Sequence, residues 1–169
     1  YFLGAPNISN SILLEIKEKK QLVKQEQLKK IKKTKNDLKI INKMLQTDPQ
    51  NLNLLLAKAS MAAIIQDIET EIETLKKIIK INPITNVKSL LAQAYLRKND
   101  GIVNEFIKKL IDEVLSEKPK DPGANFILAK YLNQNRNKNK SRNLLLKILK
   151  NLDDKGPWHQ IYKDELNIK

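Results

Sequence analysis

The chain has 169 residues, of which 41% are apolar and 30% are charged, and its formal net charge is +13. It contains no cysteine, which excludes disulfides, thiolate metal sites and cysteine nucleophiles. Only four glycines and six prolines interrupt long stretches rich in Leu, Ile, Lys, Glu, Gln and Asn. This composition favours helices, so we expect an all-α protein.

Residues 1–47 are predicted to form a short lead-in followed by a lysine-rich helix. Gly4 and Pro6 break the lead-in, and Pro and Gly are absent from Ser11 to Leu45. Residues 17–33 are mainly Lys, Gln and Glu, which is typical of a solvated helix, although a basic helix can also lie on an anionic lipid surface. Apolar residues recur with helical spacing at Leu28, Ile31, Leu38, Ile41 and Leu45.

Residues 48–169 are predicted to form a second domain of about three helix pairs. Asp48-Pro49 and Asn82-Pro83 stop helices, and two helices fit between them, over about residues 52–64 and 68–81. The spacing from Pro49 to Pro83 recurs from Pro122 to Pro157, and a period of roughly 34 residues is a repeat signature. One helix pair cannot bury its apolar face alone, so we expect the pairs to stack.

These units resemble the tetratricopeptide repeat, which combines Leu, a small residue and Tyr in its first helix with Ala-x3-Phe in its second. Leu91-Ala92-x2-Tyr95 matches the first helix best, Leu128-Ala129-x2-Leu132 fills the same positions, and Leu56-Ala57-x2-Ser60 is a weaker match. In the second helices, Ser141-x3-Leu145 and Glu71-x3-Leu75 stand for Ala-x3-Phe, with Glu71 where a small residue is expected. The resemblance implies a tetratricopeptide-repeat helical stack, an αα-superhelix, preceded by an N-terminal basic helix.

Nearly the whole chain has a narrower resemblance, to the tetratricopeptide domain of the c-type cytochrome biogenesis family CcmI (CycH). Tyr1–Pro6 resembles the lead-in that follows the last membrane helix of that family, and Leu45–Asn51 resembles the link into the repeats. Gly101–Val103 resembles an insertion that splits the middle repeat. Asp121–Phe126 and Gly156–Trp158 resemble the start and the close of the last repeat. The shared order and spacing of these elements carry the resemblance.

This resemblance implies a chaperone that holds apocytochrome c by its C-terminal helix and passes it to proteins of the haem-ligation complex. It also implies the periplasmic side of the bacterial inner membrane, with a membrane anchor expected upstream of Tyr1. A repeat groove suits such a partner, because an amphipathic helix can lay its apolar face into it. A generic repeat adaptor with no preference for apocytochromes is the alternative.

A net charge of +13 also fits a basic protein that binds nucleic acid or a lipid surface through residues 17–33. Base recognition relies on arginine, and single-strand binding relies on aromatic side chains. Aromatic residues make up 5% of the chain, and the arginines are Arg97, Arg136 and Arg142. We therefore expect no nucleic-acid partner, and a basic protein that binds nucleic acid or lipid is the second, less favoured alternative.

In tetratricopeptide arrays the first helix of each pair faces the concave side. Counting from Ala57, Ala92 and Ala129 places apolar side chains beside cations there, which suits a helix with acidic residues or a free carboxylate. Alternatively, the leucines among these residues belong to the core and the lysines are solvated. The expected peptide-binding residues are Leu54, Lys58, Met61, Ser89, Gln93, Leu96, Arg97, Phe126, Lys130 and Asn133.

We expect no catalytic residue, no metal site and no cofactor, and hence not an enzyme. His159 is the only histidine, and beside Trp158 it is predicted to cap or pack a helix. Glu69, Glu71 and Glu73 are two residues apart, so on a helix they do not converge on one point.

The repeat pattern predicts that Ala92 lies buried where two helices meet. Ala92→Leu should overpack this joint and lower the free energy of unfolding by roughly 1–3 kcal/mol. Chemical denaturation of the two proteins measures the difference. An unchanged stability would contradict this register of the repeat.

Overall fold

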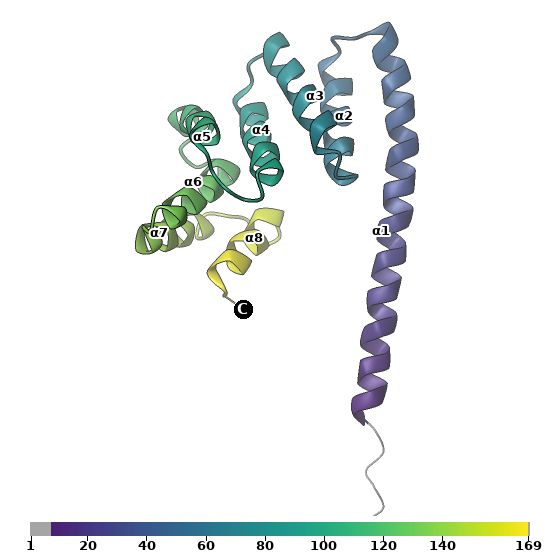
Figure 1. The fold of residues 1–169 in the computed structure, drawn as a ribbon, viewed down its shortest axis with the longest axis vertical. Helices are drawn as coiled ribbons and strands as arrows, with labels where there is room; N and C mark the ends of the chain where they lie inside the picture. Colours follow the sequence, from purple (N-terminus) through teal and green to yellow (C-terminus); the bar gives the residue numbers. More distant parts are fainter. Residues whose placement is uncertain (1–7, 169) are drawn as a thin grey trace, which may run out of the picture.

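The computed structural model describes residues 8–168, which form eight α-helices and contain no strand (Figure 1). The expected all-α class is confirmed. The lead-in at Tyr1–Pro6 lies outside the described residues, and so does Asn7. Figure 1 shows α2 to α8 following one another along an arc, with α1 beside α2.

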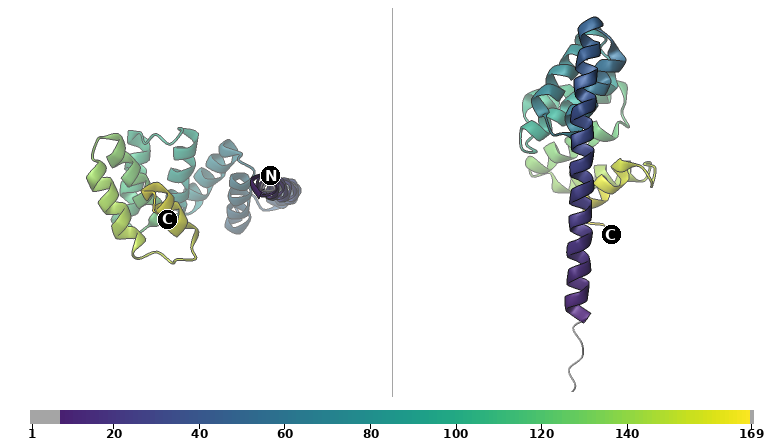
Figure 2. Two further views of the ribbon diagram at one scale, coloured as in Figure 1. Left: turned by 90° about the horizontal axis from the view of Figure 1, so that it is seen from below. Right: turned by 90° about the vertical axis from the view of Figure 1, so that its right-hand side faces the viewer.

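Helix α1 (Ile8–Thr47) has 40 residues, which makes it about 60 Å long. Every residue from Ile12 to Lys30 is exposed, and Figure 2 shows this half running beyond the rest of the molecule. The C-terminal part packs on α2. Its packed face consists of Ile31, Thr34, Leu38, Ile41 and Leu45, which recur every three or four residues.

Seven shorter helices follow: α2 (Leu52–Ile64), α3 (Ile68–Ile81), α4 (Thr85–Lys98), α5 (Glu105–Glu117), α6 (Pro122–Gln134), α7 (Lys138–Leu149) and α8 (Pro157–Leu166). The bounds expected for the two helices after Pro49 are confirmed. Pro157, in the element expected to close the last repeat, is the first residue of α8. Proline fits there because the first N–H of a helix has no partner within the helix.

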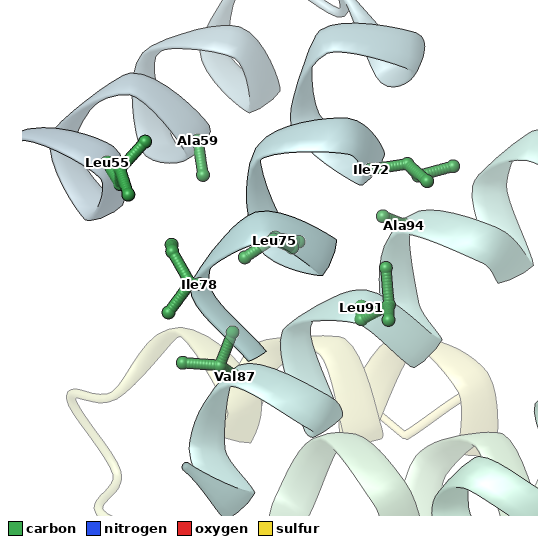
Figure 3. Close-up of a cluster of buried hydrophobic side chains, with 8 residues drawn as sticks. All are labelled: Leu55, Ala59, Ile72, Leu75, Ile78, Val87, Leu91 and Ala94. Atoms are coloured by element: carbon green, nitrogen blue, oxygen red, sulfur yellow. The ribbon is translucent and has the colours of Figure 1, made fainter. Parts of the chain in front are cut away.

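Three clusters of buried apolar side chains hold these helices together. In the first, α3 lies between α2 and α4 and packs Ile72, Leu75 and Ile78 against them (Figure 3). The second joins α4, α5 and α6 around Ile111, and the third joins α6, α7 and α8 around Leu145. Each cluster draws on three helices, so no helix pair has a core of its own.

Buried positions recur along the helix pairs α2/α3, α4/α5 and α6/α7. Ala92 is fully buried, as expected, and Ala129 is buried at the matching point of α6. In α2 the buried alanines are Ala59 and Ala62, whereas Ala57 is only half-buried. Ala59 is the one that matches, because it is the eighth residue of its helix, as Ala92 and Ala129 are of theirs. The register expected for the first unit is therefore wrong by two residues. The second helices bury Leu75 and Ile78 in α3, Ile111 and Val114 in α5, and Leu145 and Ile148 in α7.

The turn within each pair also recurs. Gln66, Asp100 and Arg136 each follow a helix in the left-handed conformation, with φ of 61°, 50° and 61°. In each turn the N–H of this residue donates to the carbonyl three residues back, and the N–H of the following residue donates to the carbonyl five residues back. In the last turn Arg136 donates to Asn133, and Asn137 donates to Leu132. This is the Schellman motif, which caps the last carbonyls of a helix.

The left-handed conformation strains an L-residue other than glycine, so Arg136→Gly should stabilise the chain. Arg136 is exposed, and we expect a gain of about 0.5–1 kcal/mol in the free energy of unfolding. The matched control is Lys109→Gly, at an exposed site inside α5, which should cost about 1 kcal/mol. Urea denaturation measures both. A loss of stability in Arg136→Gly would contradict this account of the turn.

Candidate functional site: a cleft between α2 and α4

A cleft of about 280 Å³ lies between α2 and α4, over α3. Ile64 of α2 and Leu90 of α4 are each 42% exposed, which is high for large apolar side chains. The lining is mostly apolar, with one buried carboxylate, and such a lining suits the apolar side chains of a peptide. The lining residues are Leu56, Ala59, Ser60, Ala63, Ile64, Glu71, Leu75 and Leu90.

The carboxylate at this cleft belongs to Glu71, which is only 5% exposed and forms an ion pair with Arg97 of α4. Arg97 Nη2 donates to Glu71 Oε1 at 2.6 Å and to Oε2 at 2.7 Å. The pair explains how a large acidic residue occupies a position where a small one was expected, because a buried carboxylate needs a cation to offset its lost hydration. A second cavity, of about 380 Å³, shares Ala63 and Glu71 with the cleft and includes Arg97.

Of the residues expected to bind a peptide, those on α2 lie on a different face from this cleft. Lys58 lines a cavity with Leu45 and other residues of α1, and Leu54 and Met61 lie one turn before it and one turn after it. All three are half-buried. The two-residue error in register accounts for the difference, because moving each position on by two gives Leu56, Ser60 and Ala63, which do line the cleft.

Of the expected residues on α4, Ser89 and Leu96 are buried and Gln93 is half-buried. Ser89 is 4% exposed, and its Oγ donates to Asp121 Oδ1 at 2.8 Å. Gln93 Nε2 donates to Ser89 Oγ at 3.3 Å. Gly123 of α6 allows this close approach, since a side chain there would meet both residues. Leu96 belongs to the core shared with α5 and α6, so only Arg97 of the expected α4 residues reaches the cleft region.

On α6, the expected residues Phe126 and Lys130 are in contact with α8. The ring of Phe126 lies 6.0 Å from that of Trp158 and 5.8 Å from that of Tyr162, measured between centroids. Lys130 Nζ lies 3.0 Å from Glu165 Oε2. The segment of this chain that forms α8 therefore occupies the face of α6 that was expected to receive a partner. Asn133 is exposed at the rim of a cavity of about 200 Å³ that also includes Glu165.

Helix α8 is fixed by Tyr162, which is fully buried. Its hydroxyl donates to the carbonyl of Pro122 at 2.7 Å. Burial raises the pKa of Tyr162, and the nearby charge of Asp121 raises it further. Trp158 packs against the same cluster.

The described part of the chain holds no cluster of three or more side chains that could ligate a metal ion. His159 Nε2 lies 3.3 Å from Asp154 Oδ1 at the start of α8. Residues 8–168 likewise include no helix long and apolar enough to cross a membrane.

Neither the protein-family models nor the curated proteins include a match to this chain. The features of the chain that indicate a function are therefore the cleft, the ion pair beside it and the pattern of the sequence.

Because Phe126 packs against Trp158 and Tyr162 of α8, Phe126→Ala should destabilise the fold. We expect the free energy of unfolding to fall by about 2–4 kcal/mol, because the substitution opens a cavity between α6 and α8. Trp158 is the only tryptophan, so its fluorescence reports directly on this contact. The control is Phe106→Ala, at a ring that is 52% exposed, with an expected cost below about 1 kcal/mol. Equal effects of the two substitutions would contradict the structural role of Phe126.

Proposed function

We propose that the chain is a tetratricopeptide-repeat array that binds a helical segment of another polypeptide in the cleft between α2 and α4. Three observations support the repeat assignment: a buried alanine at matching points of α2, α4 and α6, matching apolar positions in α3, α5 and α7, and the same capped turn within each pair. Helix α8 packs on α6 and α7 much as α6 packs on α4 and α5, which fits a helix that closes the array.

The observation that carries the binding proposal is the exposed apolar cleft with a cation next to it. Leu90 and Ile64 offer apolar surface in the cleft. Both contacts with Glu71 come from Nη2 of Arg97, whose side chain is 47% exposed. Within residues 8–168 neither Nη1 nor Nε of Arg97 has a hydrogen-bond partner, so both can donate to a carboxylate. An amphipathic helix that ends in a free carboxylate satisfies both features.

The partner we propose is the C-terminal helix of an apocytochrome c, held for transfer to the haem-ligation proteins. The ordered elements that resemble the CcmI (CycH) family support this client, and so does the apolar lining of the cleft with Arg97 beside it. The same resemblance favours the periplasmic side of the bacterial inner membrane. A generic adaptor would differ from such a chaperone in one property: it would bind unrelated amphipathic helices as well as the apocytochrome helix.

Calorimetric titration of the full chain with the C-terminal helix peptide of a bacterial apocytochrome c tests this proposal. We expect micromolar binding that survives moderate salt, because apolar burial is screened far less than exposed charge. The double variant Ile64→Ser/Leu90→Ser should weaken binding by about tenfold or more, since it removes the most exposed apolar surface of the cleft. A peptide with an amidated C-terminus should also bind more weakly, by several-fold.

The matched control is Ile40→Ser/Met44→Ser on α1, a pair of similarly exposed apolar residues outside the cleft. It should leave the affinity unchanged. Equal binding of a scrambled amphipathic helix would favour the adaptor. Loss of binding with salt, or with neutralised lysines in residues 17–33, would favour the electrostatic alternative.

A further inference from the structure

A larger cavity, of about 630 Å³, lies among α3, α4 and α5. Its lining combines three lysines and one glutamate of α3 with the apolar side chains of Leu91 and Phe106. Leu91 is buried, whereas Phe106 is 52% exposed. A concave surface that pairs an exposed aromatic ring with cations has the composition of an interaction site. Its lining residues are Glu73, Lys76, Lys77, Ile79, Lys80, Leu91 and Phe106.

This cavity is separate from the cleft between α2 and α4. Glu71 and Leu75 of α3 line the cleft, whereas Lys76 and Lys80 line the cavity. At about 100° per residue, these two pairs lie on different faces of α3. The two sites therefore use opposite sides of the same helix and can be tested separately.

The cations of the cavity are free to meet a ligand. Among the described residues, Lys76, Lys77 and Lys80 form no ion pair, and all three are exposed. Lys76 and Lys80 are one turn apart, so their Cβ atoms are about 6 Å apart along one face. Together with Glu73, the cavity carries a net positive charge, which selects an anionic ligand.

Aromatic contacts fix the shape of one side of this cavity. The ring of Tyr95 meets that of Phe106 edge to face, with centroids 4.9 Å apart. Lys76 Nζ lies 5.5 Å from the centroid of Tyr95. The cation–π contact and the ring pair hold the ammonium group and the exposed ring in a defined arrangement.

We propose that this cavity binds a second polypeptide segment, an acidic amphipathic helix. Carboxylates one turn apart on the segment pair with Lys76 and Lys80. An apolar side chain from its other face packs on Phe106 and reaches Leu91. The open cavity matches a helix laid along α3, and its cations complement the charge of such a helix.

The test is a titration of the full chain with a capped helical probe peptide that carries Glu on one face and Leu and Phe on the other. We expect the probe peptide to bind with micromolar affinity. A peptide with Gln in place of every Glu should not bind. Lys76→Gln/Lys80→Gln should weaken binding about tenfold, and Glu73→Gln should strengthen it about twofold to threefold because it removes a repelling carboxylate.

The matched control is Lys39→Gln/Lys43→Gln, two exposed lysines one turn apart on α1, which should bind the probe like the unmodified chain. The variant Ile64→Ser/Leu90→Ser should also bind it unchanged, which separates this site from the cleft. Binding that is insensitive to Lys76→Gln/Lys80→Gln would overturn the proposal. It would also be overturned if the same lysines were required for binding vesicles of anionic phospholipid while the probe peptide did not bind.

Discussion

The stacking of α3 between α2 and α4 is the contact on which the rest of this structure depends. Leu75 and Ile78 are almost completely buried, but only because α2 and α4 both cover them. The same requirement recurs in α5 and α7, so each helix pair relies on the next for its core. Because α3 packs between its neighbours, one of its faces lines the cleft and another lines the lysine-lined cavity.

Residues that break helices were enough to predict much of the fold. Asp48-Pro49 and Asn82-Pro83 indicated where α1 and α3 end, because proline and the residue before it disfavour helix. The register of α2 was harder, since Ala57 and Ala59 are both small and either can fill the close-packed position. Burial against α3 selects Ala59, and that choice depends on a neighbour that the local pattern does not specify.

The site was predictable only in part, because its key interactions join helices that are distant in the sequence. Glu71 was recognisable as a large residue in a position where a small one was expected, but its partner Arg97 comes from α4, in the next helix pair. Phe126 looked like a free anchor because nothing in the local pattern places α8 upon it. The signal that was available is the aromatic pair Trp158 and Tyr162 spaced one turn apart, which predicts an apolar face on α8 that must be covered.

We propose that a helical partner lies in the cleft between α2 and α4. Hydrogen–deuterium exchange of the full chain, with and without the apocytochrome c C-terminal peptide, tests it most directly, because the method reports the location of protection. With the peptide bound, we expect slower exchange of the backbone amides in α2 and α4, around Ile64 and Leu90, and no change in the exposed half of α1. Protection confined to α1, or to α6–α8, would contradict it.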